Sequence, residues 1–270
     1  MTPTAAPFRA ARDTAVIVRR NLLRNVRLPQ LLLFATVQPV MFLLLFNYVF
    51  GGAIGRALPP AADGEYLNWL IPGLLVQVAA FGSGQTALGL TEDLSKGVID
   101  RFRSLPMARA AVLAGRTVAD VIRNGAVITL MLVVGLLIGF RWQTNVFGML
   151  GGVAVALAFS FSMSWVMALV GLTVKNPEAV QSAVFIPVFP LVFASSVFVP
   201  TATMPSWLRA FADHQPVTAT TNAIRGLVLG RGALPAGHTV AGDVLTALAW
   251  AIAILVVFVP PAVRAYRRIT

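Results

Sequence analysis

Residue types that catalyse reactions or bind metals are scarce in this chain, and none has the spacing of a familiar catalytic or metal-binding motif. The sequence has no cysteine and two histidines, His214 and His238. It contains no GxxxxGK(S/T) phosphate loop, no HExxH helix and no nucleophile elbow. We therefore expect a chain that is not an enzyme, holds no metal or cofactor, forms no disulfide and hydrolyses no ATP itself.

Acidic groups that could carry protons through a membrane are also few. Asp243 and Asp120 are the carboxylates that come near the apolar segments. Ion-coupled carriers usually need such groups deep in the membrane. Asp120 follows Arg116 by four residues and precedes Arg123 by three, so we expect a helix-surface ion pair rather than a proton relay.

The polar stretch 91–124 has the spacing of a docking helix. Four apolar residues recur there in steps of four, four and three and mark one face: Leu94, Val98, Phe102 and Leu105. Glu92 and Asp93 would favour a helix start, and Pro106 would end the helix. A short helix with an apolar ridge and charged flanks suits a groove on another protein. The alternative is a solvated basic loop that only fixes topology.

Long apolar segments must position these residues. With 57% hydrophobic and 11% charged residues, the chain is not an ordinary soluble domain. A hydrocarbon core of about 30 Å needs roughly 20 helical residues. We expect an all-α integral membrane protein with six transmembrane helices, at 31–50, 67–90, 107–140, 146–172, 179–199 and 240–261.

The basic residues are divided unevenly between the connections. Sixteen of the 21 lie in the N-terminal arm, the 91–124 stretch, the 173–178 loop and the C-terminal tail, and five lie in the other connections. The excess predicts that both termini are cytoplasmic. The net charge of +11 is thus explained by topology and by contact with anionic membrane lipids, not by nucleic acid. Because 19 of these residues are arginine, a bacterial source is indicated.

Two further segments fit neither a span nor a simple loop. Residues 8–28 have apolar positions every three or four residues with arginines between them, which predicts an interfacial helix ending before Pro29. Residues 200–239 contain two short apolar stretches that cannot span, so we expect outer re-entrant helices. In the fifth span, Phe185, Phe189 and Phe193 recur every fourth residue.

Residues 92–115 resemble the inner signature of ABC-2 type permeases, with Lys96-Gly97, Arg101-Phe102, Ser104-Leu105-Pro106 and Arg109 as the matching elements. The likeness extends over the whole chain and is nearest to daunorubicin/doxorubicin-resistance-type multidrug exporter membrane subunits. It includes Met204-Pro205-Ser206-Trp207-Leu208 and Ala223-Ile224-Arg225-Gly226-Leu227. One departure is Gln215, where the family often has asparagine.

The resemblance implies a type V exporter-like permease of the bacterial cytoplasmic membrane. Such a permease pairs with a second copy or a paralogue, and each is seated on a nucleotide-binding ATPase subunit that holds ATP and Mg²⁺. The implied coupling region is 92–106, with the contact residues Lys96, Gly97, Asp100, Arg101, Phe102, Arg103, Leu105 and Pro106.

The expected cargo is a lipophilic, drug-like compound. Aromatic and amide side chains without fixed charge suit such a path, and the candidates are Gln77, Phe81, Gln85, Phe189, Phe193 and Ser196. Ordinary helix packing is the alternative for each of them. Two other functions stay open at this point: export of a lipid or lipid-linked polysaccharide, and an autonomous secondary transporter or intramembrane enzyme.

The predicted orientation can be checked with single thiols because the chain has no cysteine of its own. We expect Asp63→Cys to react in intact cells with a membrane-impermeant maleimide, because residue 63 lies in a predicted outer loop. Ser104→Cys should react only after the cells are permeabilised. The reverse labelling pattern would overturn the orientation.

Overall fold

A computed structural model describes residues 5–27, 29–55, 58, 65–98, 109–174 and 176–269. Every regular element in these ranges is helical. The α-helices are α1 (Ala5–Arg27), α2 (Pro29–Leu45), α3 (Gly51–Ile54), α4 (Tyr66–Gly82), α5 (Gly84–Ser95), α7 (Arg109–Leu137), α8 (Val146–Val174), α9 (Pro177–Phe193), α10 (Ser206–Asp213), α11 (Pro216–Leu229) and α12 (Val240–Ile269). A π-helical turn, Phe46–Phe50, joins α2 to α3.

Five segments are long and apolar enough to cross a membrane: Ala35–Ile54, Tyr66–Ser95, Ala111–Leu137, Val146–Val174 and Val240–Arg268. The predicted span 179–199 corresponds to α9, which is apolar but has only 17 residues. At 1.5 Å per residue, α9 covers about 26 Å, slightly less than a hydrocarbon core. The count of six spans therefore stays a prediction.

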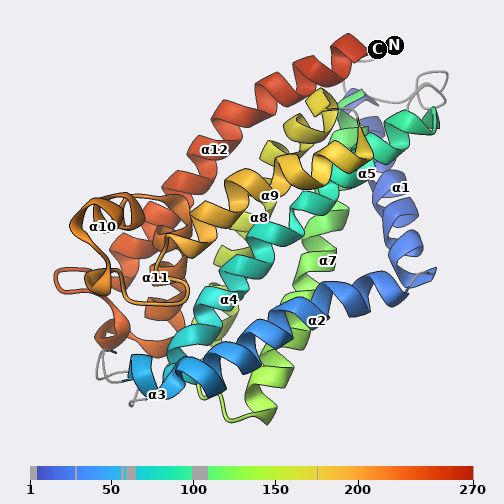
Figure 1. Ribbon diagram of the computed structural model, residues 1–270. Coiled ribbons are helices and arrows are strands. Elements are labelled where there is room, and N and C mark those ends of the chain that lie inside the picture. The colour runs from blue at the N-terminus through green and yellow to red at the C-terminus, as the bar shows by residue number, and fades with distance from the viewer. Residues whose placement is uncertain are drawn as a thin grey trace.

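The long helices lie side by side around α4 and α8 (Figure 1). All residues of α4 from Tyr66 to Ala80 are buried, and α8 packs against α12, α5, α11, α7 and α4. The chain begins and ends at one end of this bundle, which we call the terminal end; α10 and α11 lie at the opposite end. The second span is thus enclosed by protein, whereas few residues of the segments Ala35–Ile54 and Val240–Arg268 are buried.

The second span is broken in the middle. α4 ends at Gly82, Ser83 forms a turn, and α5 begins at Gly84. A Cβ atom on Gly82 would collide with the side chain of Asn124, so only glycine lets α7 come this close. Farther along α5, Thr91 donates to the carbonyl oxygen of Gly171 on α8 at 3.0 Å, which fastens α5 to the core.

The start predicted for a docking helix at Glu92 and Asp93 is wrong. α5 runs through both residues and ends at Ser95, and Gly97 then adopts a positive φ of 66°. The backbone N–H of Gly97 bonds to the carbonyl of Leu94, as is usual where a helix ends. Glu92 and Asp93 therefore lie in the last turn of the second span. Of the predicted coupling residues, Lys96 and Gly97 are described; those from Asp100 to Pro106 lie outside the described residues.

At the opposite end, residues 200–239 form α10 and α11 with 3-10 turns on either side. α10 is largely exposed, whereas α11 is buried except for Leu227 and Pro216. Arg225 of α11 is fully buried, with its guanidinium 3.4 Å from the ring centroid of Trp69 and its Nη2 donating to the carbonyl of Ser196 at 2.6 Å. α11 is thus part of the packed bundle; its re-entrant role stays a prediction.

Candidate functional site

A cluster of ionised side chains joins three helices at the terminal end. Arg20 of α1 lies 3.0 Å from Asp93 of α5, through Nη2 and Oδ1. Arg116 of α7 reaches the other oxygen of Asp93 at 3.7 Å and, through Nε, Asp120 at 3.8 Å. Thr86 of α5 donates to Asp120 at 2.5 Å. The cluster therefore ties α5 to both α1 and α7, directly beside the predicted coupling region.

Close helix contact makes this cluster possible. A Cβ atom on Gly89 would overlap the guanidinium of Arg116, so the glycine allows Arg116 to lie across α5 and donate to the carbonyl of Gln85 at 3.1 Å. A Cβ atom on Gly115 would likewise crowd Ile17 of α1. The predicted ion pair between Arg116 and Asp120 is confirmed, but Asp120 is only 5% exposed and is not on the helix surface.

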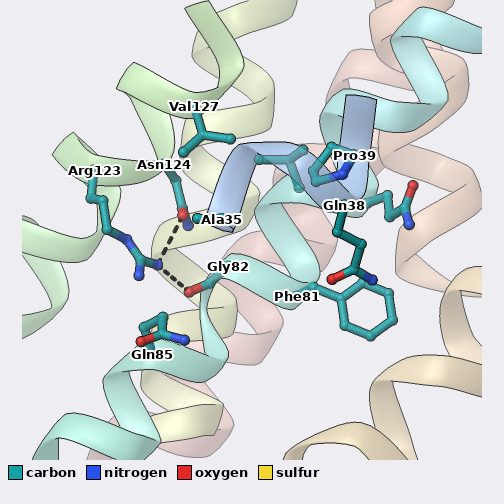
Figure 2. Close-up of a pocket in the computed structure, with 11 residues that line it drawn as sticks. Ala35, Gln38, Pro39, Phe81, Gly82, Gln85, Arg123, Asn124 and Val127 are labelled. Atoms are coloured by element: carbon teal, nitrogen blue, oxygen red, sulfur yellow. Dashed lines mark hydrogen bonds between the residues drawn. The ribbon is translucent and has the colours of Figure 1, made fainter. Parts of the chain in front are cut away.

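A polar pocket of about 120 Å³ lies beside this cluster, toward the middle of the bundle. It lies between α2, α4, α5 and α7, and its polar lining residues are Gln38, Gln77, Gln85, Arg123 and Asn124. Phe81 forms part of its apolar wall (Figure 2). No carboxylate lines the pocket within the described ranges. Three of the predicted pathway residues, Gln77, Phe81 and Gln85, thus meet at one site.

Arg123 supplies the charge of this pocket. Its Nη2 donates to the carbonyl of Gly82 at 2.5 Å and to Oδ1 of Asn124 at 3.2 Å, as Figure 2 shows. The carbonyl of Gly82 is free because the helix breaks there. Asn124 in turn donates to Ser160 of α8 at 2.6 Å. The Nε of Arg123 and the Oε1 of Gln77 are buried, and neither has a hydrogen-bond partner within the described structure.

The aromatic stripe predicted on the fifth span forms a continuous row. The ring centroids of Phe185 and Phe189 are 5.0 Å apart, and those of Phe189 and Phe193 are 4.2 Å apart. Phe81 joins the row to the pocket at 5.9 Å from Phe185. Phe185 and Phe189 remain 48% and 40% exposed, so the row is an open apolar surface.

Ser196 does not belong to this surface. It is buried at the opposite end, where its backbone and hydroxyl oxygens accept hydrogen bonds from Arg225. The structure thus brings five of the six pathway candidates together and leaves Ser196 apart from them. Whether any of these residues contacts cargo stays a prediction.

Sequence reasoning missed Arg123, Asn124 and Gln38 as pocket residues. The sequence pattern places Arg123 among the basic residues that set the topology and beside Asp120. Its nearest hydrogen-bond partner is instead the carbonyl of Gly82, which is 41 residues away in the sequence. That contact depends on the helix break, and no local sequence pattern around residue 123 predicts it. The described residues contain no cluster of three or more metal-ligating side chains.

Comparisons with known proteins agree with this architecture. The family model for ABC-2 type transporters matches residues 12–229. A daunorubicin resistance ABC transporter permease protein of Streptomyces coeruleorubidus is 36% identical over 98% of this chain and 92% of its own length. A probable doxorubicin resistance ABC transporter permease protein of Mycobacterium tuberculosis is 26% identical over 87% and 80%. A putative transport permease of Cyanophora paradoxa is 27% identical over 78% and 72%.

The ionic cluster predicts a specific loss of stability. Asp93→Asn removes the carboxylate shared by Arg20 and Arg116, and we expect it to destabilise the fold by roughly 1–3 kcal/mol, since Arg116 is buried but Arg20 is partly solvated. The readout is the unfolding temperature of the detergent-purified protein. Asp213→Asn, which breaks the exposed pair with Arg209, is the matched control and should change stability by no more than about 0.5 kcal/mol. Equal effects of the two substitutions would contradict the structural role of the cluster.

Proposed function

Because the chain belongs to the ABC-2 type transporter family, we propose that it is the membrane-spanning permease subunit of an ABC exporter that moves a lipophilic, drug-like compound out of a bacterial cell. The observation that carries this proposal is the 36% identity, over nearly the whole chain, to a daunorubicin resistance permease. The open row of phenylalanines beside a pocket rich in amides gives a lipophilic compound a surface to follow.

ATP and Mg²⁺ are held by a separate nucleotide-binding subunit, which docks on the coupling region 92–106. α5 leads directly into this region, and the Asp93 cluster joins α5 to α1 and α7. A push on the coupling region therefore moves three helices as one unit. Two of these helices, α5 and α7, also line the polar pocket, so the motion reaches the residues that would contact cargo.

A second permease, either a copy or a paralogue, completes the route. α2 and α9 support this arrangement, because both expose large apolar side chains, among them Met41 at 64% and Ile186 at 70%. Membrane lipid covers the remaining apolar surface. Both termini lie at the same end of the bundle, and the excess of basic residues assigns that end to the cytoplasm.

The central test is transport with and without the motor. The permease is reconstituted into liposomes alone or with the ATP-binding subunit encoded beside it, and efflux of a fluorescent lipophilic drug is followed after ATP addition. We expect ATP-dependent efflux only when both subunits are present. Transport by the permease alone would instead identify an autonomous carrier.

The docking role of the coupling region is tested by introducing a negative charge on its apolar ridge. We expect Phe102→Asp to abolish ATP-dependent efflux while the permease remains in the membrane, because a buried carboxylate in the docking groove would be strongly unfavourable. Phe102→Leu keeps the ridge apolar and should retain most of the transport. The measurement is efflux together with co-purification of the ATPase. Full coupled transport by Phe102→Asp would argue against docking at this site.

A further inference from the structure

We infer that the polar pocket around Arg123 binds an acidic oxygen group, a carboxylate or a phosphate, carried by an apolar body. The inference rests on the proposed function and adds to it the chemical class of the cargo: an amphiphilic acid rather than a cationic amine. It depends on three observations, which are the charge balance near the pocket, the unpartnered polar atoms that line it, and its continuity with the phenylalanine row.

The carboxylates near the pocket are paired with other arginines, although Asp120 also attracts Arg123 electrostatically from one helical turn away. Arg20 and Arg116 share Asp93, and Arg116 also pairs with Asp120, which accepts a hydrogen bond from Thr86. Arg123 forms no ion pair with any carboxylate in the described ranges. Arg123, which lines the pocket, is therefore the arginine of this group that has no carboxylate in direct contact within the described structure.

The contacts that Arg123 makes do not require a cation. A neutral amide could donate to the carbonyl of Gly82 equally well. Arg123 is 14 residues, or about 21 Å of helix, from the end of α7 at Leu137, which places it well inside the bundle rather than at the end of a span. A charge at such a depth costs several kcal/mol unless it is paired. A bound anion would compensate this charge and would also satisfy the buried Nε.

The other polar residues of the pocket supply hydrogen-bond donors for the same group. Gln77 is 2% exposed; its Oε1 is an acceptor without a partner within the described structure, so only the Nε2 end of this amide can donate to a bound anion. Gln38 and Gln85 line the pocket with exposed side chains, one on each side. The amides can donate or accept, so the selectivity comes from the guanidinium: with no carboxylate in the described lining, its charge favours an acceptor-only group and repels an ammonium.

The size of the pocket limits what it can hold. A volume of about 120 Å³ accommodates a small head group but not a complete drug-sized molecule. The rest of the ligand must extend along the neighbouring surface. Phe81 stands at the pocket wall and leads to Phe185 and then Phe189, so an apolar or aromatic body can lie on this row while its acidic group reaches Arg123.

The test compares three fluorescent probes that share one ring system. Anthracene-9-carboxylate, anthracene-9-methanol and anthracene-9-methylammonium are titrated against the purified permease in phosphatidylcholine nanodiscs, and binding to empty nanodiscs is subtracted. We expect the wild-type chain to bind the carboxylate at least about tenfold more tightly than the ammonium, as one charge-assisted hydrogen bond would give. In Arg123→Gln this preference should disappear, while binding of the methanol probe changes little.

A second variant covers the case in which Arg123→Gln does not fold. Gln38 is exposed at the pocket, so Gln38→Glu adds a carboxylate there without disturbing buried contacts. It should remove the preference for the carboxylate probe or reverse it. Arg209→Gln, an exposed arginine on α10, is the charge-matched control and should bind all three probes like the wild type. Preference for the ammonium probe in the wild type, or unchanged selectivity in Gln38→Glu, would overturn the inference.

The acidic group could come from exported cargo or from an anionic membrane lipid. Repeating the titration in nanodiscs that contain phosphatidylglycerol separates these sources, and both outcomes support a site for an acidic group. Displacement of the carboxylate probe would assign the pocket to lipid, and unchanged binding would assign it to cargo. Because this assay contains neither ATP nor the motor subunit, loss of anion selectivity disproves the pocket assignment and leaves the ATP-dependent efflux test of the exporter function intact.

Discussion

The arrangement of this permease depends on one constraint: a helix broken inside a membrane must have its free backbone groups satisfied by other parts of the protein. The break in the second span frees the carbonyl of Gly82, and Arg123 of α7 donates to it. Ser83 donates its hydroxyl to Ala80 within the same turn. Because Gly82 has no side chain, α7 can approach closely enough for Asn124 to connect this joint to Ser160 of α8. One backbone irregularity thus fixes the relative positions of three spans.

The same contacts explain why force on the terminal end would reach the middle of the bundle. Below the break, α5 is held by ion pairs to α1 and α7 and by the hydrogen bond from Thr91 to α8. Ion pairs and hydrogen bonds in a low-dielectric environment are stiff and directional, unlike contacts between apolar side chains. α5 is therefore coupled to its neighbours more firmly than α2 or α9, whose apolar faces are largely open. The helices with open faces are the ones that remain available to a second permease or to lipid.

Much of this architecture could be predicted from local patterns. The apolar segments, the uneven distribution of arginine and the repeat of Phe185, Phe189 and Phe193 all lie within short stretches of sequence, and the structure places the three rings in one row. Glu92 and Asp93 predict a helix start, because acidic residues are favourable there, but the structure places them in the last turn of α5. Here their charge serves a tertiary contact instead: Asp93 neutralises arginines from two other helices. The contact of Arg123 with the carbonyl of Gly82 could not be predicted either, because the two residues are 41 positions apart in the sequence.

If the polar pocket binds cargo as proposed, the position of the break would let its affinity change. Gln77 and Phe81 belong to α4, whereas Gln85 belongs to α5 and Arg123 to α7, so the pocket lining comes from both sides of Ser83. A change in the angle between α4 and α5 alters the distances between these groups and the contact of Arg123 with Gly82. An exporter must bind its cargo in one state and release it in another, and only a difference in interaction between the two states can drive that cycle. If α5 moves together with α1 and α7, to which it is ion-paired, a pocket lined from both sides of the break would supply such a difference.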